Sequence, residues 1–91
     1  MFDPRLLRAF VAIVETGSFT LAADQLHMTQ STISQQLARL EHAVGKPLIE
    51  RQSRSLQLTT AGESLLGYAR RILALQFEAQ NVLSTTTGSI P

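Results

Sequence analysis

The segment from residue 18 to residue 51 constrains this chain most, because it predicts two short helices that meet at a tight corner. Ser18 is suited to cap the first helix, over about residues 19–27, since its hydroxyl can accept a hydrogen bond from a free backbone N–H. Thr29 can cap the second helix, over about residues 30–44, in the same way. Leucine, alanine and valine at helical spacing favour a mainly α body over a sheet.

The second of these helices has one apolar and one polar face. Apolar residues recur along it at intervals of four, three and four, at Ile33, Leu37, Leu40 and Val44. The side chains that point away from this stripe, or lie beside it in the first turn, are Gln30, Ser31, Thr32, Ser34, Gln35, Ala38, Arg39 and His42. Such amide, hydroxyl and guanidinium groups read base edges or contact phosphates when a helix enters the major groove of DNA. The pattern favours sequence-specific binding of double-stranded DNA.

A small β-hairpin, or wing, is expected over about residues 49–57. Two short apolar pieces, 48–49 and 56–58, flank a polar turn that carries Arg51 and Arg54. Isolated arginines in turns are usually solvated. Because these two follow the polar helix directly, contact with backbone phosphates or an adjacent minor groove is the better interpretation.

A helix is also expected on each side of this unit. Asp3 followed by Pro4 predicts a helix start, and Gly17 predicts its end. Thr60 and Glu63 are spaced as a capping box that opens a long helix to about residue 83 or 84.

The long helix carries more apolar surface than one small domain can cover. Its heptad-like seam comprises Leu65, Tyr68, Ile72, Leu75, Ala79 and Val82. A second apolar set beside it comprises Leu66, Ala69, Leu73, Phe77 and Leu83. Since a second copy of the chain could cover the seam, we expect a homodimer. Residues 85–91 lack this periodicity and are interpreted as a hinge.

Composition narrows the remaining function classes. A chain of 91 residues suffices for one small domain, and 44% apolar against 5% aromatic residues predicts an aliphatic core. The absence of cysteine excludes disulfides and thiolate-held metal, and it fits a cytoplasmic protein. There is no apolar run near the ~20 residues that cross a bilayer, so no membrane is expected. The net charge of +1 alone would favour an ordinary solvated surface.

Two other function classes fit the sequence less well. No catalysis and no cofactor are expected, because the acidic residues are scattered and the two histidines, His27 and His42, lie fifteen positions apart. A helical protein-interaction module that uses the amphipathic helix 61–83 is the serious alternative. Against it, the polar surface of residues 30–42 lacks the aromatic or aliphatic anchors of a protein interface.

A family resemblance runs from about Pro4 to Leu83. It is carried by Leu7-x-x-Phe10, Val14-x-x-x-Ser18-Phe19-Thr20-x-Ala22-Ala23, Leu26-His27-Met28-Thr29-Gln30-Ser31-x-Ile33-Ser34-x-Gln36-Leu37, Leu40-Glu41, Gly45-x-x-Leu48-Ile49-x-Arg51 and Leu58-Thr59-x-Ala61-Gly62. Together these motifs resemble the N-terminal DNA-binding domain of LysR-type transcriptional regulators. The resemblance implies a three-helix core with a wing, that is a winged helix-turn-helix, followed by a long linker helix that pairs with its mate on a dyad-symmetric DNA site.

The resemblance also implies which residues contact DNA. Base or nearby phosphate contacts would come from Gln30, Ser31, Thr32, Ser34 and Gln35, and wing contacts from Arg51 and Arg54. Thr29, Ser18 and Thr20 are weaker phosphate candidates, and for Ser18 a plain capping role is equally expected.

The expected organisation has three parts. Residues 1–59 form the winged helix-turn-helix, 60–84 the linker helix, and 85–91 the hinge to a larger C-terminal domain. In the family that domain binds a small-molecule effector, and these 91 residues do not contain it.

Overall fold

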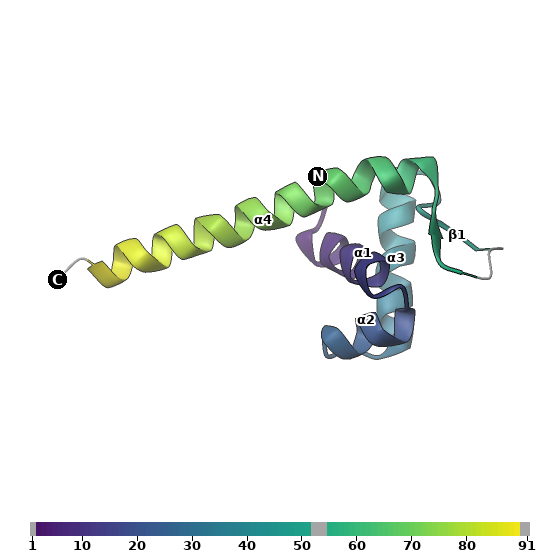
Figure 1. Ribbon diagram of the computed structural model, residues 1–91, viewed down its shortest axis with the longest axis horizontal. Helices are drawn as coiled ribbons and strands as arrows, with labels where there is room; N and C mark the ends of the chain where they lie inside the picture. Colours follow the sequence, from purple (N-terminus) through teal and green to yellow (C-terminus); the bar gives the residue numbers. More distant parts are fainter. Residues whose placement is uncertain (1, 52–54, 90–91) are drawn as a thin grey trace.

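The computed structural model describes the backbone of residues 2–51 and 55–89, and side chains as far as residue 84. The elements within these ranges are α1 (Pro4–Thr16), α2 (Phe19–Gln25), α3 (Gln30–Val44), β1 (Ile49–Glu50), β2 (Gln57–Leu58) and α4 (Thr60–Ser89). Helices α1 to α3 and the start of α4 form a compact body, from which α4 projects (Figure 1). The molecule therefore measures 56 × 25 × 19 Å. The predicted mainly α winged fold is confirmed.

The first three helices begin at the caps that the sequence predicts. Each capping side chain accepts a hydrogen bond from a backbone N–H of the first turn: Asp3 from Arg5 at 2.9 Å, Ser18 from Leu21 at 3.1 Å and Thr29 from Thr32 at 3.0 Å. Gly17 and Gly45 follow α1 and α3 in the left-handed conformation, with φ of 70° and 81°. Local side-chain chemistry thus sets these boundaries.

Helix α2 ends two residues earlier than the expected limit of about residue 27. His27 has a φ of 56°, which lies in the left-handed region and interrupts helical geometry. The Met28 backbone N–H then donates to the Ala23 carbonyl at 2.8 Å, which closes the corner before Thr29 starts α3.

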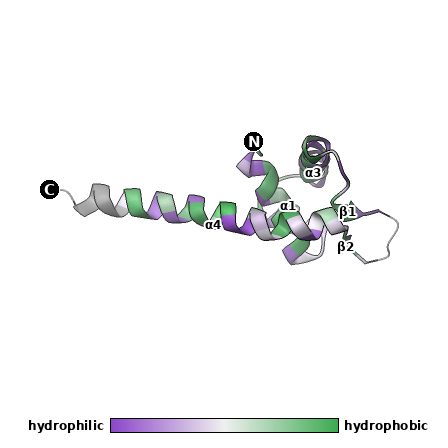
Figure 2. Ribbon diagram, turned by 90° about the horizontal axis from the view of Figure 1, so that it is seen from above, coloured by the Kyte–Doolittle hydropathy of each residue, from purple (hydrophilic) through white to green (hydrophobic). Residues whose placement is uncertain are grey.

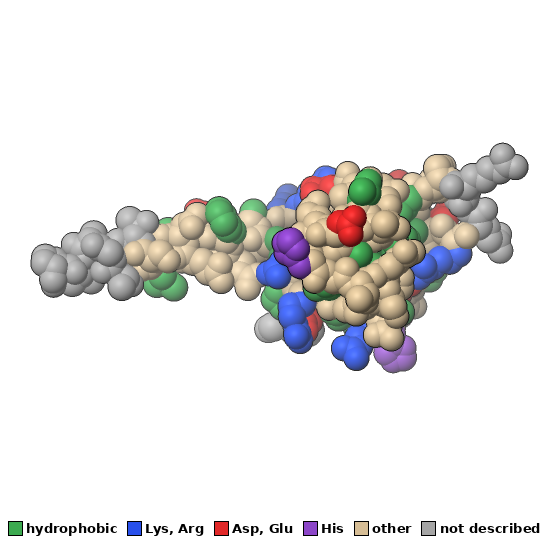
Figure 3. All heavy atoms as spheres, turned by 90° about the horizontal axis from the view of Figure 1, so that it is seen from below, with side chains coloured by type: hydrophobic (Ala, Val, Ile, Leu, Met, Phe, Trp, Pro, Cys, Tyr) green, Lys and Arg blue, Asp and Glu red, His purple; other side chains and the backbone are tan. Residues whose placement is uncertain are grey.

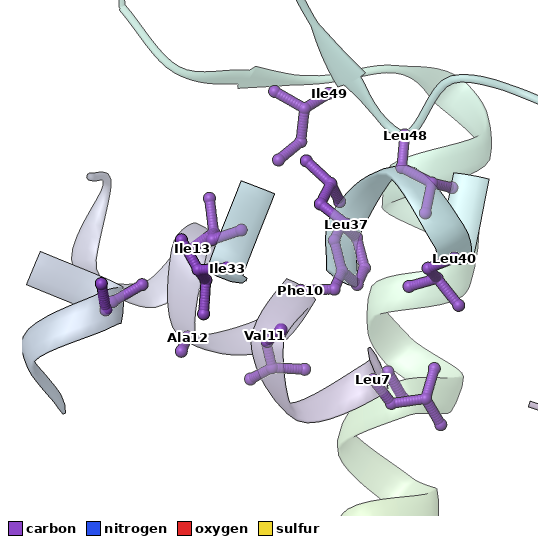
Figure 4. Packing of buried hydrophobic residues seen from close by; sticks show 14 residues of the cluster. Leu7, Phe10, Val11, Ala12, Ile13, Ile33, Leu37, Leu40, Leu48 and Ile49 are labelled. Atoms are coloured by element: carbon purple, nitrogen blue, oxygen red, sulfur yellow. The ribbon is translucent and has the colours of Figure 1, made fainter. Parts of the chain in front are cut away.

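The core lies between α1 and α3, whose buried side chains point toward one another (Figure 4). Its largest fully buried members are Leu7, Phe10, Ile13, Ile33, Leu37, Leu40 and Leu48. Burying each such side chain stabilises the fold by about 1.5–3 kcal/mol relative to its exposure. Helix α1 contacts α2, α3 and α4, so it forms the centre of the body. The predicted aliphatic character is confirmed, with Phe10 the aromatic exception among the fully buried side chains of the described residues.

The wing is a short antiparallel ladder, in which Ile49 pairs with Leu58 and Glu50 with Gln57. The two-residue strands confirm a hairpin in the predicted place. The hairpin tip at 52–54 lies outside the described residues.

Thr59 joins the wing to α4. Its backbone N–H donates to the Leu48 carbonyl at 3.0 Å, and its hydroxyl donates to the Pro47 carbonyl at 2.7 Å. The same hydroxyl accepts from the Gly62 N–H at 3.0 Å, so Thr59 is the N-cap. The expected capping box that starts at Thr60 is therefore wrong by one residue, because the tertiary contact with Pro47 fixes the earlier hydroxyl.

Helix α4 packs against the body with one face and then leaves it. Ala69 is buried, and Leu66 and Leu73 are partly buried against the core. The helix continues to Ser89, so its expected end at about residue 83 or 84 is wrong. Residues 84–87 are serine and threonine, which lower helix propensity only slightly, and the first glycine after Gly67 is residue 88. Among the helices of residues 2–51 and 55–89, none is apolar and long enough to cross a membrane.

Gly62 allows the first turn of α4 to touch the chain before the wing. A Cβ placed on Gly62 would collide with the Leu48 backbone carbonyl oxygen. Gly67, one and a half turns further along the same helix, has open space where its Cβ would lie. The two glycines therefore differ in packing but share a helical setting.

Replacing each glycine by alanine should separate packing from helix propensity. Gly67→Ala should raise the free energy of unfolding by up to about 1 kcal/mol, as alanine usually does within a helix. Gly62→Ala should lower it by about 1–3 kcal/mol, because the backbone of residue 48 must shift. Urea denaturation of both variants measures this, and an equal gain in stability at both positions would contradict the close approach.

Candidate nucleic-acid interface

Helix α3 presents a continuous polar surface to solvent. Its opposite face is held by Ile33, Leu37 and Leu40, each with 0% of its surface exposed. We call the outward surface the polar face of α3; its exposed members are Gln30, Ser31, Ser34, Gln35, Arg39 and His42. Ala38 is exposed among them and Thr32 is partly buried. The predicted orientation of the helix is thus confirmed.

The surface around this face is mostly uncharged. Seen from below, much of the body is tan in Figure 3, with separate lysine and arginine, acidic, histidine and hydrophobic groups among the tan atoms. Uncharged amides and hydroxyls with small neighbours let a helix backbone approach a groove closely and still form directed hydrogen bonds.

Arg39 lies on one flank of α3. Within the part of the chain that the structure describes, it forms no ion pair. Residues two apart on a helix are rotated by about 200°, so Arg39 and Glu41 point to opposite flanks. On the Arg39 flank lies Asp3: hydrogen bonds from the Arg5 side chain and backbone lower the pKa of the Asp3 carboxyl, and the charge of Arg39 acts in the same direction.

Glu41 fastens the wing to the other flank. One carboxylate oxygen accepts from the Leu48 backbone N–H at 2.7 Å and from that of Ile49 at 3.4 Å. The other oxygen accepts from Arg51 Nη2 at 2.7 Å. The Glu41 side chain is 15% exposed and that of Arg51 55% exposed. Arg51 is therefore held against α3 while about half of its side-chain surface still faces solvent.

Sequence reasoning missed the role of Glu41, which it counted among scattered acids. The available signal was an acidic residue on the helix flank that faces the predicted wing. Arg54, the other predicted wing contact, lies outside the described residues.

The hydroxyl groups near the corner have different duties. Those of Ser18 and Thr29 accept backbone N–H groups as helix caps, and the Thr29 hydroxyl also donates to that of Thr32 at 2.9 Å. Thr20 instead reaches across to α3, where its hydroxyl lies 3.2 Å from Gln30 Oε1. The structure thus brings Thr20 to the polar face of α3.

The predicted dimerisation seam on α4 is largely exposed. Tyr68 is 62% exposed, Leu75 64%, Val82 57% and Ile72 39%, whereas Leu65 is partly buried. Ala79 is also exposed. Figure 2 shows bands of hydrophobic residues along the projecting part of α4. The Arg71 guanidinium lies 5.7 Å from the centroid of the Tyr68 ring and shields part of it.

No group of three or more histidine, aspartate or glutamate side chains that could hold a metal ion occurs among the described residues. The exposed side chains on the polar face of α3 carry amide, hydroxyl, guanidinium and imidazole groups, which can form hydrogen bonds.

The family model and the relatives that match this chain all describe helix-turn-helix regulatory proteins. Residues 4–63 match the family model described as bacterial regulatory helix-turn-helix protein, lysR family. Over 88 residues the chain is 39% identical to an uncharacterized HTH-type transcriptional regulator in the ibpB-leuC intergenic region of Azotobacter vinelandii, covering 97% of this chain and 61% of that protein. It is 42% identical over 79 residues to the HTH-type transcriptional activator CmpR of Synechocystis, covering 87% of this chain and 26% of the activator. The chain thus spans only part of each of these two relatives.

Solved structures extend the likeness to DNA complexes. The crystal structure of the BenM DNA-binding domain with benA site 1 DNA matches with a TM-score of 0.86 and 36% identity, covering 99% of this chain and 100% of that one. The CbnR domain–DNA complex matches with a TM-score of 0.84 and 36% identity, covering 94% of this chain and 99% of that one.

Removal of the Glu41 carboxylate should loosen the wing. Glu41→Ala leaves the buried Leu48 N–H without its acceptor and should lower the free energy of unfolding by about 1–3 kcal/mol. Arg51→Ala removes only a partly exposed ion pair and should lower it by less than about 1 kcal/mol. Urea denaturation gives both values, and amide hydrogen exchange should quicken at residues 48 and 49 in the first variant. Unchanged protection at residue 48 would refute the role of the carboxylate.

Proposed function

This chain belongs to the lysR family of bacterial regulatory helix-turn-helix proteins, and we propose that it binds double-stranded DNA sequence-specifically through the polar face of α3. The observation that carries the proposal is the arrangement of α3 itself. Its buried stripe fixes the rotation of the helix, so that Gln30, Ser31 and Gln35 all face solvent together. A helix with this surface fits the major groove and can pair with base edges.

Cations on both flanks of α3 support the same placement. Arg39 lies on one flank and Arg51, held by Glu41, on the other. A helix in the major groove has a phosphate backbone on either side, so each arginine is positioned to contact one strand. Arg54 is proposed to extend the wing contact toward the minor groove.

Contacts are also proposed for the remaining residues on α3 and at the helix starts. Ser34 is proposed to contact a base, and Thr32 a base or nearby phosphate. The Ser18 hydroxyl accepts from Leu21 but keeps its own hydrogen, so we propose that it can still donate to a phosphate. The Thr29 hydroxyl donates to that of Thr32, so we propose that a phosphate contact there uses backbone N–H groups at the start of α3.

We further propose a homodimer that pairs through α4. The exposed seam of Leu65, Tyr68, Ile72, Leu75, Ala79 and Val82 would be covered by the same seam of a second copy. Two-fold pairing of this kind places two copies of α3 on a dyad-symmetric site. The similarity to the BenM and CbnR domains, which were solved in complex with DNA, supports the proposal that this chain binds DNA.

The complete regulator is proposed to be larger than this chain and to act in the cytoplasm. The A. vinelandii relative and CmpR both exceed the matched region. We propose that a C-terminal domain that follows α4 binds a small-molecule effector; residues 85–89 of the expected 85–91 hinge are helical. A helical interaction module remains the alternative use of the exposed face of α4, and it predicts no affinity for DNA.

Titration of labelled duplexes tests the DNA-binding proposal. Binding that weakens steeply between two salt concentrations is expected from phosphate contacts. With a duplex selected from a random pool, Gln35→Ala should weaken binding by about 1–3 kcal/mol and relax preference at one base pair. Gln80→Ala, an exposed glutamine on the projecting part of α4, is the matched control and should bind normally. Failure to bind any duplex at low salt would favour the interaction module.

An acidic residue in the α4 seam tests the dimer. Ile72→Asp places a charge where two apolar faces would meet, and it should give monomers by analytical ultracentrifugation at concentrations where the unaltered chain is a dimer. Asn81→Asp adds the same charge on another side of α4 and should stay dimeric. If Ile72→Asp also remains a dimer, the seam is misassigned.

A further inference from the structure

We propose that Thr20 is a positioning residue for Gln30 and that it decides which hydrogen-bonding groups Gln30 presents to DNA. This inference rests on the proposed DNA-binding function and deepens it. Its basis is the contact between the two helices of the corner, in which the Thr20 hydroxyl donates to Gln30 Oε1 at 3.2 Å. Both side chains are exposed, so water competes with this hydrogen bond, and the experiments below measure whether it persists.

Thr20 is the hydroxyl near the corner that is directed toward the polar face of α3. Ser18 and Thr29, its nearest counterparts, use their hydroxyls to cap α2 and α3. Thr20 lies in the first turn of α2 and Gln30 in the first turn of α3. The tight corner brings these two helix starts within side-chain reach of each other.

The contact fixes the chemical character of the Gln30 amide. A glutamine amide has one carbonyl acceptor and an NH₂ group with two donors. The bond to Thr20 holds the carbonyl oxygen toward α2, although one of its two lone pairs stays free, and the two Nε2 hydrogens are left to bind DNA. Donors match guanine N7 and O6 or thymine O4, whereas the bidentate pairing with adenine also requires the carbonyl. Gln30 should therefore select a base edge that consists of acceptors.

Gln35 provides the natural contrast. It is exposed on the same helix, and within the described residues its side chain forms no hydrogen bond. Its amide can therefore rotate to pair with adenine in the bidentate manner. The two glutamines thus differ in conformational freedom. The Gln30 side chain is already oriented in the free protein, whereas the Gln35 side chain becomes oriented only when DNA binds.

The first arm of the test uses the free protein and needs no DNA. Nitrogen-15 relaxation of the side-chain amides should show Gln30 more ordered than Gln35. Thr20→Val, which removes the hydroxyl but keeps the shape, should raise the mobility of the Gln30 amide to that of Gln35. Thr20→Ser should restore its order. An unchanged Gln30 amide in Thr20→Val would overturn the proposal, whatever the result with DNA.

The second arm measures base preference. The base pair read by Gln30 is the one at which Gln30→Ala relaxes selectivity, and four duplexes that differ only there are then titrated. The unaltered chain should favour guanine or thymine over adenine by roughly 5- to 100-fold. Thr20→Val should reduce this ratio below about threefold, Thr20→Ser should keep it, and Thr20→Val should change nothing further in a Gln30→Ala background.

The outcomes of the second arm separate the proposals. A uniform loss of affinity on all four duplexes in Thr20→Val, with the preference intact, would mean that Thr20 contacts a phosphate directly and would overturn this inference. A preference for adenine in the unaltered chain would do the same. Equal binding of the unaltered chain to every duplex in the pool would instead refute sequence-specific recognition, while the relaxation measurement still decides whether Thr20 orients Gln30.

Discussion

The packing of α3 on α1 determines the rest of this structure. Leu37 and Leu40 of α3 are buried against Leu7 and Phe10 of α1, and rotation of α3 about its own axis would expose them. Each such exposure would cost about 1.5–3 kcal/mol, a large fraction of the stability of a small domain. Since side chains on a helix have fixed angular positions, the burial of one stripe also fixes the direction of every polar group opposite to it. Recognition chemistry in this chain is thus a consequence of core packing.

Polar contacts then position the parts that the core does not reach. Glu41 accepts two backbone N–H groups before and within β1 and holds Arg51, and Thr59 links the chain before the wing to the start of α4. Both residues use a side chain to form hydrogen bonds with backbone groups of residues 47–49. The wing is too short to pair all of these groups within its own ladder. Two strands of two residues could not persist alone, so the wing depends on these contacts and on burial of Leu48 and Ile49.

The sequence predicted those features that depend on neighbours along the chain. The caps at Ser18 and Thr29 and the outward direction of the α3 polar face follow from local chemistry and from the helical period. By that reasoning Thr59 and Thr60 are equally good N-caps for α4. The hydrogen bond from Thr59 to the Pro47 carbonyl, which is distant in sequence, makes Thr59 the cap. Likewise the end of α4 was placed too early, because loss of amphipathic periodicity does not break a helix unless a residue also disrupts its backbone.

The candidate site shows the same division. The exposed amides and hydroxyls could be named from the helical wheel. The contact of Thr20 with Gln30 and the contacts of Glu41 with the wing join residues seven to ten positions apart, and no local pattern encodes their approach. Because Gly62 lets the first turn of α4 touch the Leu48 backbone directly, the direction of α4 is set by this contact with the body. Over its 30 residues the helix reaches about 45 Å, so a tilt of about 5° would swing its far end by about 4 Å, close to the rise of one base pair. In the proposed dimer, small differences in the angle between α4 and the body would therefore change how the two copies of α3 are aligned along a duplex.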